Sequence, residues 1–339
     1  MQPSPDISVS QAVQTGVPTL SAIQAPVREE LDQVGSELRR IVLSDFDLIE
    51  EVNQHLLFLQ GKLFRSTLLL LASRVHGEPD HDARTLAAVV ELVHLATLVH
   101  DDAVDHSVLR RGLPTVNALW THQVAVIMGD YLYSRAVTDL AELGSLDALA
   151  VLARAANEMS VGEMRQLTSY DAIDFSEQDY YRLIAAKTAS LMSAACEMGS
   201  LAGYAGNRAQ LARFGHNLGM AFQIADDLLD YTGSEAVTGK PSGQDLRERK
   251  VTLPLIGALS NATEAEEREI RSFFTRVAPT DEEIQLVIGI VGDRGGLEYA
   301  KGRADHYAGL AHESLTGLSS GSALDALSEA VSYAVDRRR

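Results

Sequence analysis

Apolar residues recur along most of the chain at positions i, i+3, i+4 and i+7, and no stretch sustains an alternation of apolar and polar residues. This spacing gathers apolar side chains on one face of a helix, so it predicts an all-α protein. The predicted helices cover residues 26–42, 46–59, 62–76, 81–105, 116–142, 146–170, 177–204, 207–231, 251–260, 264–275, 281–291, 294–316 and 321–337.

Helix starts and chain breaks support this division. At three predicted helix starts, Ser or Thr stands three residues before Asp or Glu, as in a capping box or a near variant of one. These pairs are Ser176 with Asp179, Thr263 with Glu266, and Thr280 with Glu283. No linker rich in proline, glycine or serine divides the chain into two similar parts, so we expect one domain over residues 21–339. Residues 1–20 are rich in small polar residues without a helical period, which is typical of a disordered extension.

An aspartate cluster of the form D-D-x-x-D occurs twice, each time at the end of a long apolar helical run. The clusters are Asp101, Asp102 and Asp105, and Asp226, Asp227 and Asp230. Helical positions i and i+4 share a face, so each cluster brings together like charges that repel one another. A lone cluster is most often a solvated helix end. Two copies beside buried-looking helices indicate a metal site instead, because Mg²⁺ prefers oxygen ligands and shares carboxylates with substrate phosphates.

The composition narrows the functional classes. The net charge of −18 argues against a nucleic-acid partner, which would require a basic face. A single cysteine, Cys196, rules out an internal disulfide and fits a reducing compartment. The N-terminus lacks the basic start and apolar stretch of a secretory signal, and no apolar run approaches the ~20 residues that span a bilayer. We therefore expect a soluble, cytoplasmic protein without a transmembrane segment.

Side chains that bind anions lie on both sides of the first cluster. Lys62 and Arg65 stand at i and i+3 of a helix start, where free backbone N–H groups also favour an anion. His94 lies seven residues before the first aspartate, on nearly the same helix face, and Arg110 and Arg111 follow the cluster. Together these donors indicate an anion bound beside the metal-binding face.

Structural alternatives exist for the same residues. Lys62 and Arg65 could be surface charges, and His94 could be a core histidine. Glu91 and His94 also form the E-x-x-H pair of di-iron helical bundles. That site needs two such helices, and the other match in this chain contains a proline, so the di-iron hypothesis is weak.

The second half of the chain shows the same arrangement. Lys187 and Thr188 lie in a helix that is otherwise small and apolar, where an unpaired lysine is costly to bury. Gln223 lies three residues before the second cluster. The loop 238–246 carries Lys240, and Lys250 follows it. Lysines on a flexible loop suit a lid over bound phosphates. Only five of the 29 basic residues are lysines, and four of these five lie in the segments described here.

Taken together, these motifs resemble the trans-isoprenyl diphosphate synthases, in order and spacing, over nearly the whole chain from about residue 23. Residues 94–117 (HLATLVHDDAVDHSVLRRGLPTVN) are similar to that family's first aspartate-rich region, and residues 219–230 (GMAFQIADDLLD) to its second. Shorter family motifs match residues 61–65, 129–131, 187–189 and 239–254. The resemblance implies an isoprenoid-synthase bundle of helices around a deep central cavity, usually in a homodimer.

The resemblance also implies roles for individual residues. Two or three Mg²⁺ ions would bind to Asp101, Asp105 and Asp226, with Asp102, Asp227 and Asp230 close by. The diphosphate of isopentenyl diphosphate would be held by Lys62, Arg65, His94 and Arg111. The allylic diphosphate would be held or covered by Arg110, Lys187, Thr188, Gln223, Lys240 and Lys250.

The implied reaction fits these residue types. An allylic C–O bond ionises to a carbocation and a diphosphate, and cations aimed at the leaving group stabilise its developing charge. The alkene of isopentenyl diphosphate then attacks, and a proton is lost. No side-chain nucleophile is needed, which agrees with the lack of a Ser/His/Asp or Cys/His candidate in the chain.

Two positions depart from the family pattern. Ser66 stands where the family usually has proline, and Arg249 stands where it usually has glycine. Neither change removes a charge, but the second makes the placement of Lys250 less secure.

The residues four and five positions before the first aspartate, Thr97 and Ala96, would help to form the floor under the growing prenyl chain. Both are small, so the resemblance implies a long product of six to ten isoprene units (C30–C50), released with a transient membrane contact. A bulky residue deeper in the cavity would instead limit the product to geranylgeranyl or farnesyl diphosphate.

Two other functions share part of this pattern. A terpene cyclase would share the fold and the first cluster, but its second metal motif normally reads N/D-D-x-x-S/T-x-x-x-E. The non-catalytic subunit of a two-component prenyl synthase would typically lack the aspartate clusters. Both clusters are intact here, so we expect an active prenyltransferase.

Overall fold

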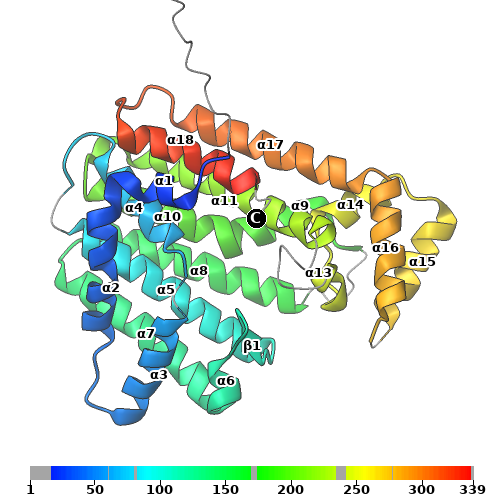
Figure 1. The fold of residues 1–339 in the computed structure, drawn as a ribbon, viewed down its shortest axis with the longest axis horizontal. Helices are drawn as coiled ribbons and strands as arrows, with labels where there is room; N and C mark the ends of the chain where they lie inside the picture. Colours follow the sequence, from blue (N-terminus) through cyan, green and yellow to red (C-terminus); the bar gives the residue numbers. More distant parts are fainter. Residues whose placement is uncertain are drawn as a thin grey trace, which may run out of the picture.

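The computed structural model describes residues 17–59, 61–79, 82–168, 174–233, 242–276 and 278–336, and nearly all of them belong to helices (Figure 1). The helices are α1 (Leu20–Gln24), α2 (Arg28–Val42), α3 (Asp47–Phe58), α4 (Phe64–Arg74), α5 (Ala83–Val104), α6 (Val116–Leu119), α7 (His122–Glu142), α8 (Leu146–Thr168), α9 (Glu177–Ile184), α10 (Ser190–Leu201), α11 (Arg208–Thr232), α13 (Gln244–Arg247), α14 (Leu253–Leu259), α15 (Glu264–Thr275), α16 (Asp281–Asp293), α17 (Gly296–Ser314) and α18 (Ser322–Val335). Short 3₁₀ turns cover Ala25–Val27 and Ala205–Asn207, a π-turn covers Ala185–Ala189, and β1 (Leu109–Arg110) pairs antiparallel with β2 (Leu113–Pro114).

The predicted capping residues begin the helices assigned to them. Complete capping boxes start α15 and α16, where Thr263 and Thr280 each exchange hydrogen bonds with a glutamate three residues on. Ser176 accepts a hydrogen bond from the backbone N–H of Asp179 at the start of α9. Most of the expected extension 1–20 lies outside the described residues. Of its described part, Thr19 caps α1, which begins at Leu20.

Several predicted elements differ from the structure. The predicted helix 116–142 is two helices, because Thr121 caps α7 with its side chain and ends the short α6 before it. The predicted helix 177–204 contains the π-turn at 185–189. The β1–β2 hairpin was not predicted. Residues 244–247 of the predicted loop form a one-turn helix, α13, whose first N–H groups are bound by Asp230.

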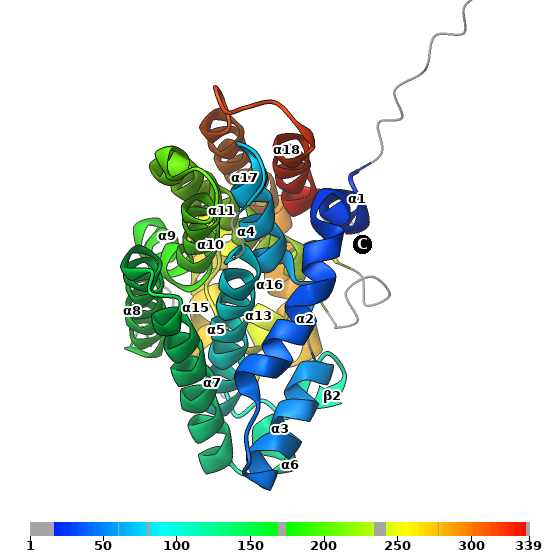
Figure 2. The same cartoon turned by 90° about the vertical axis from the view of Figure 1, so that its left-hand side faces the viewer.

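Helix α5 lies at the centre of the bundle. It packs against α2, α4, α7 and α10, and the view along the long axis shows it enclosed by them (Figure 2). By length and composition, α5 is the one described helix that passes the test for a membrane span, and 61% of its apolar window is buried inside the protein. That degree of burial is usual for a core helix. Its last turn carries the first aspartate cluster to the end of the core.

The main core is formed by α2, α4, α5, α7, α8, α10 and α11, and a smaller one joins α14, α15 and α16 at one end of the molecule (Figure 1). Cys196, on α10, is fully buried in the main core and carries a free thiol. Burial raises the pKa of this thiol well above its usual range. The cysteine is therefore part of the packing.

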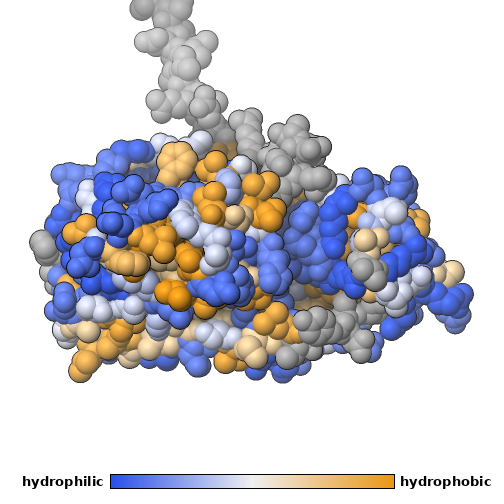
Figure 3. Space-filling model, turned by 90° about the horizontal axis from the view of Figure 1, so that it is seen from below, coloured by the Kyte–Doolittle hydropathy of each residue, from blue (hydrophilic) through white to orange (hydrophobic). Residues whose placement is uncertain are grey.

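Large apolar side chains also reach the surface. On the face seen from below, they form patches between hydrophilic side chains (Figure 3). The α7–α8 hairpin exposes Val126, Ile127, Val161 and Met164, and Ile127 is 63% exposed. The short connection 143–145 makes these helices antiparallel, which brings Ile127 level with Val161. We name these four residues the α7–α8 apolar face.

Candidate active site

Both aspartate clusters open into one cavity of about 1760 Å³. Asp101 and Asp105 reach it from the end of α5, and Asp226, Asp227 and Asp230 reach it from the end of α11. The two clusters, 125 positions apart in the sequence, therefore meet across a shared space. Other residues singled out from the sequence also line this cavity: Lys62, Arg65, His94, Thr97, Arg111, Lys187, Thr188, Gln223 and Lys250.

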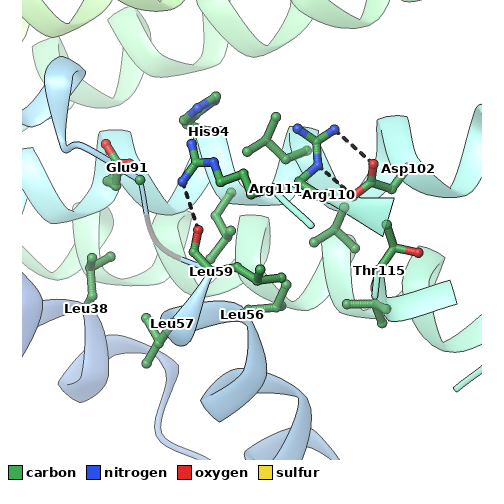
Figure 4. A pocket seen from close by; sticks show the side chains of 15 residues that line it. Leu38, Leu56, Leu57, Leu59, Glu91, His94, Asp102, Arg110, Arg111 and Thr115 are labelled. Carbon is green, nitrogen blue, oxygen red and sulfur yellow. Dashed lines mark hydrogen bonds and ion pairs between the residues drawn. The ribbon is translucent and has the colours of Figure 1, made fainter. Parts of the chain in front are cut away.

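In the first cluster, Asp102 turns away from the cavity and binds Arg110. The Nε and Nη2 atoms of Arg110 donate to the two carboxylate oxygens at 2.8 and 2.9 Å (Figure 4). Arg110 does not line the large cavity, so the structure does not bring it to the expected allylic-diphosphate position. The reason is electrostatic, since a bidentate pair with a buried carboxylate is its best partner here.

Arg111 lies beside this pair and does line the cavity. Its Nη1 donates to the backbone carbonyl of Leu59 at 3.0 Å, which ties the β1–β2 hairpin to the end of α3 (Figure 4). Asp101 and Asp105 face the cavity from the same helix end. Within the first cluster, these two carboxylates are the ones that a ligand in the cavity can reach.

In the second cluster the middle aspartate, Asp227, is also held by protein donors, although it lines the cavity. Asp227 is 6% exposed, and both its oxygens are bound by protein donors. The Tyr180 hydroxyl donates to Oδ2 at 2.5 Å, and Gln223 Nε2 donates to Oδ1 at 2.8 Å. Asp230 accepts the backbone N–H groups of Gln244 and Asp245 at 3.1 and 3.0 Å. Asp226 is left as the exposed carboxylate of this cluster.

Lys187 and Thr188 project from the π-turn, a local widening of the helix that often marks a functional site. The Lys187 ammonium lies 2.5 Å from Glu163 and donates to Gln166 at 2.9 Å, and both partners are on α8. The Thr188 hydroxyl donates to Gln223 at 2.7 Å. The lysine is therefore paired, as its position in an apolar helix requires.

The opposite wall is built by the start of α4. Lys62 is exposed at the cavity, Arg65 lies one turn on, and His94 faces them from α5. Burial, and then the charge of Arg65, lower the pKa of His94 well below its usual value, so the imidazole is neutral at pH 7. Ser66, where the family usually has proline, is buried and donates to the carbonyl of Ala87 at 3.0 Å.

Among the described residues, four other than glycine have a left-handed backbone: Leu63, His106, Arg111 and Arg249. Three of them, all but His106, line the cavity. Such residues cost free energy and gather at functional sites when the surrounding structure holds them in place. The φ of Arg249, +56°, accounts for the glycine that the family usually has there.

The segment after the second cluster contributes Asp245, Glu248 and Lys250 to the cavity wall. The Lys250 ammonium pairs with Glu248 at 2.6 Å. Burial lowers the pKa of Lys250, but Glu248, Asp245 and Asp105 outweigh this effect and raise it overall. Lys240 lies outside the described residues.

The cavity carboxylates are hard to ionise. Burial raises the pKa of Asp101 to about 6 and that of Asp105 in the same direction. Burial, followed by the charge of Asp230, raises the pKa of Asp245 to about 7. A divalent cation would relieve this repulsion, and the all-oxygen donors suit Mg²⁺. Among the described residues, no group of three acidic, His or Cys side chains is close enough to hold a metal ion. Mg²⁺ is usually bound by one or two carboxylates together with substrate phosphates.

Sequence reasoning missed four residues of this site: Glu163, Gln166, Tyr180 and Asp245. Glu163 and Gln166 stand at i and i+3 on α8, a pattern that many solvated helices share. Tyr180 is half of a tyrosine pair at a buried helix position, and only its long-range contact reveals its role. Asp245 lies in the predicted loop, where an acidic residue is unremarkable.

The two residues predicted to set chain length are placed differently. Thr97 lines the cavity one turn below Asp101, about 6 Å deeper at 1.5 Å per residue. Ala96 is 2% exposed, belongs to the main core and does not line the cavity. Of these two residues, only Thr97 therefore borders the cavity.

Comparisons with known proteins agree with this geometry. The polyprenyl synthetase family profile matches residues 46–291. The chain belongs to that family. The all-trans-nonaprenyl-diphosphate synthase (geranyl-diphosphate specific) of Rhodobacter capsulatus is 38% identical to it, over 93% of this chain and 97% of that protein. Component 2 of the heptaprenyl diphosphate synthase of Geobacillus stearothermophilus is 37% identical, over 88% and 93%.

A solved structure is similar over the same length. The polyprenyl synthase of Caulobacter crescentus, solved with calcium and isoprenyl diphosphate, has a TM-score of 0.89 and 33% identity, covering 96% of this chain and 99% of that one. The all-α isoprenoid-synthase fold and the prenyltransferase class expected from the sequence are thereby confirmed.

Proposed function

We propose that this polyprenyl synthetase is a Mg²⁺-dependent all-trans polyprenyl diphosphate synthase that joins isopentenyl diphosphate to an allylic diphosphate, head to tail. One observation carries the proposal. Two acidic helix ends, Asp101 and Asp105 on α5 and Asp226 on α11, open into one cavity that also has cationic side chains on two separate walls. Two anion sites around a shared acidic centre suit a reaction between two diphosphates.

The two walls suggest which substrate binds where. Isopentenyl diphosphate would be held by Lys62, Arg65, His94 and Arg111, which lie at the start of α4, on α5 and on the hairpin. The allylic diphosphate would be held by Lys187, Thr188, Gln223 and Lys250, with Lys240 from the segment outside the described residues. Arg110 would join the second group only by leaving Asp102.

This chain's residues would then act on charge and position. Bound Mg²⁺ would neutralise the diphosphate leaving group as the allylic C–O bond ionises. Lys187 would stabilise the same charge from the π-turn, and exchange Glu163 for the phosphate oxygens. The alkene carbon of isopentenyl diphosphate attacks the carbocation, and the departing diphosphate takes the proton. The apolar walls keep water from the cation.

A long product, of six to ten isoprene units, is favoured by the small side chain of Thr97 at the cavity wall. The relatives from Rhodobacter and Geobacillus are named as nonaprenyl and heptaprenyl enzymes. A geranylgeranyl or farnesyl product is the alternative, and it requires a bulky residue deeper in the cavity.

The α7–α8 apolar face supports assembly as a homodimer. Large exposed apolar patches are uncommon on monomeric proteins, and all four residues of this face are exposed, Ile127 to 63%. We place the enzyme in the cytoplasm, with a transient membrane contact when the hydrophobic product leaves.

The test is a product assay with purified protein, Mg²⁺, isopentenyl diphosphate and a set of allylic primers. We expect all-trans products of C30–C50, sized by chromatography. Asp101→Ala should lower turnover by about 10²–10³-fold, the usual cost of removing one group that stabilises transition-state charge, without lowering the melting temperature. Asp305→Ala, an exposed aspartate on α17, is the matched control and should retain full activity.

Each competing function gives its own result in this assay. A hydrocarbon product would indicate a terpene cyclase. No product until a second protein is added would indicate the non-catalytic or incomplete half of a two-component enzyme. An Asp101→Ala variant with normal turnover would refute the proposed metal site.

A further inference from the structure

The middle aspartate of each cluster is held by protein donors on both oxygens. Arg110 does this for Asp102, with two hydrogen bonds from one guanidinium. Tyr180 and Gln223 do it for Asp227, with one hydrogen bond each. Asp102 does not line the cavity whereas Asp227 does, and these hydrogen bonds fix the direction of both carboxylates. The donors in the second cluster include a residue, Tyr180, that does not bind any diphosphate in the proposed mechanism.

The Tyr180–Asp227 contact is short and buried. Tyr180 is 1% exposed and Asp227 is 6% exposed. Burying a carboxylate is costly unless hydrogen bonds satisfy its oxygens. At 2.5 Å, the hydrogen bond from the Tyr180 hydroxyl to Asp227 Oδ2 is at the short end of the usual range for two oxygens. The hydroxyl therefore fixes where the Asp227 carboxylate points.

The same hydrogen bonds join two elements of the site. Tyr180 on α9 and Thr188 in the π-turn belong to one continuous helical segment. Their partners on α11, Asp227 and Gln223, stand one turn apart and bind one another. The resulting bridge runs Tyr180–Asp227–Gln223–Thr188 and connects α9, before the π-turn, to the π-turn itself. Lys187 lies within this span.

We propose that Tyr180 is a positioning residue for the second aspartate cluster: through Asp227 it sets the direction of the neighbouring Asp226 and the position of the π-turn that carries Lys187. This inference rests on the proposed function, because it assigns Asp226 and Lys187 to the metal and the allylic diphosphate. It adds a residue that touches neither substrate. A purely structural role for the Tyr180 hydroxyl is the competing explanation.

The first experiment compares wild type with Tyr180→Phe, which keeps the buried ring and removes the hydroxyl. Calorimetry should show Mg²⁺-dependent binding of a non-reactive allylic diphosphate analogue weakened about 10-fold, the lower end of the usual range for residues behind a metal ligand. The Mg²⁺ concentration for half-maximal turnover should rise by a similar factor. The KM for isopentenyl diphosphate should stay constant, because its site lies on the α4 wall.

The matched control is Tyr181→Phe at the next position. The Tyr181 hydroxyl donates to Glu177 at 2.6 Å and accepts from Arg303 at 2.7 Å, so its loss removes two hydrogen bonds, against one for Tyr180. These partners lie between α9 and α17 rather than beside the aspartates. We expect a lower melting temperature with unchanged Mg²⁺ dependence.

A double-mutant cycle with Asp227→Asn tests the route of the effect. If Tyr180 acts through Asp227, the double variant should bind the analogue no more weakly than the weaker single variant. Additive losses, wild-type binding by Tyr180→Phe, or a Tyr180→Phe protein that does not fold would each overturn the proposal. If wild type itself shows no Mg²⁺-dependent binding of the analogue, it is the proposed function that fails.

Discussion

At the scale of single residues, the cavity contains carboxyl groups whose ionised form is unfavourable. Asp101 and Asp245 have pKa values raised to about 6 and about 7, chiefly by burial, although Lys187 and Lys250 partly oppose the effect. Carboxylates held in this way do not stabilise the fold. A ligand that carries divalent cations would bind to these carboxylates, because the cations neutralise their mutual repulsion.

This has a consequence for stability against pH. Because the pKa of Asp101 is higher in the folded state than its ordinary value of 3.8, the folded protein holds a proton between about pH 4 and 6 that the unfolded chain has lost. The contribution of Asp101 to the free energy of unfolding therefore falls as pH rises through this window and is constant above it. At pH 7 the penalty should be about 3 kcal/mol.

Thermal melts in metal-free buffer from pH 4 to 8 would measure this effect. The Asp101→Asn variant should match wild type at pH 4 and become progressively more stable than wild type up to about pH 6. Mg²⁺ with inorganic pyrophosphate should close the gap. A difference that does not change with pH would contradict the assignment.

Part of the residue-scale picture was accessible from the sequence. The two D-D-x-x-D patterns indicate all six aspartates, and Arg110 lies eight positions after Asp102. Which aspartates are held by other protein side chains was not accessible. That depends on partners such as Tyr180, which is 47 positions from Asp227 and carries no charge to mark it.

At the scale of elements, the π-turn is the feature that brings Lys187 to the cavity. It lies between two glycines, Gly162 on α8 and Gly219 on α11. A Cβ at Gly162 would lie 2.7 Å from the Ala186 side chain, and one at Gly219 would lie 2.5 Å from the Ala189 Cα atom. Neither neighbouring helix could approach the turn so closely with a larger residue. The two glycines therefore allow α8 and α11 to pack closely against the turn on both sides.

Gly219→Ala should consequently destabilise the fold and displace Lys187. The new methyl group meets backbone rather than a flexible side chain, so we expect a loss of about 1–3 kcal/mol. Turnover should fall more than in an equally destabilised variant elsewhere. Unfolding in urea and steady-state kinetics would measure the two effects.

Gly35→Ala is the comparison, since a Cβ there would meet no atom within 4 Å in the middle of α2. It should stabilise the protein by about 0.5–1 kcal/mol, the gain in helix propensity, without changing turnover. Gly219→Ala with unchanged stability would show that the helices can separate freely.

Helical periodicity predicted most elements because they have an apolar stripe, and a capping residue marks the start of some of them, as Thr263 does for α15. It could not predict the π-turn, since the segment around it consists mostly of small and apolar residues, and the rotation of about 100° caused by one extra residue leaves no visible change in such a pattern. It also missed α13, whose four residues are too few to show a period and depend on Asp230 for their cap.

At the scale of the whole molecule, the bundle leaves a space below the first cluster that is bordered by one face of α5. Thr97 lies on that face with Asp101, whereas Ala96 points into the core. The position of a side chain around α5, and not its distance along the chain, decides whether it can limit the product. The sequence alone proposed both residues, because periodicity does not say which neighbours a face meets.

Thr97→Phe should therefore shorten the product by at least one isoprene unit, as the ring fills space about one turn below the metal-binding face. Ala96→Phe should instead overpack the core, at a cost of about 1–3 kcal/mol, with the product distribution nearly unchanged. Sizing the products of both variants beside wild type would distinguish these outcomes. A shorter product from Ala96→Phe alone would mean that the core opens onto the tunnel at this point.

The buried thiol of Cys196 makes it possible to follow substrate binding and unfolding by chemical labelling. Alkylating reagents attack thiolates, and an enclosed sulfur with a raised pKa reacts only when the fold opens. A cysteine introduced on the cavity rim would thus be the sole fast-reacting group on the native surface. A fluorophore attached there would report substrate binding in real time. The rate at which Cys196 is labelled would measure the rate of global unfolding independently.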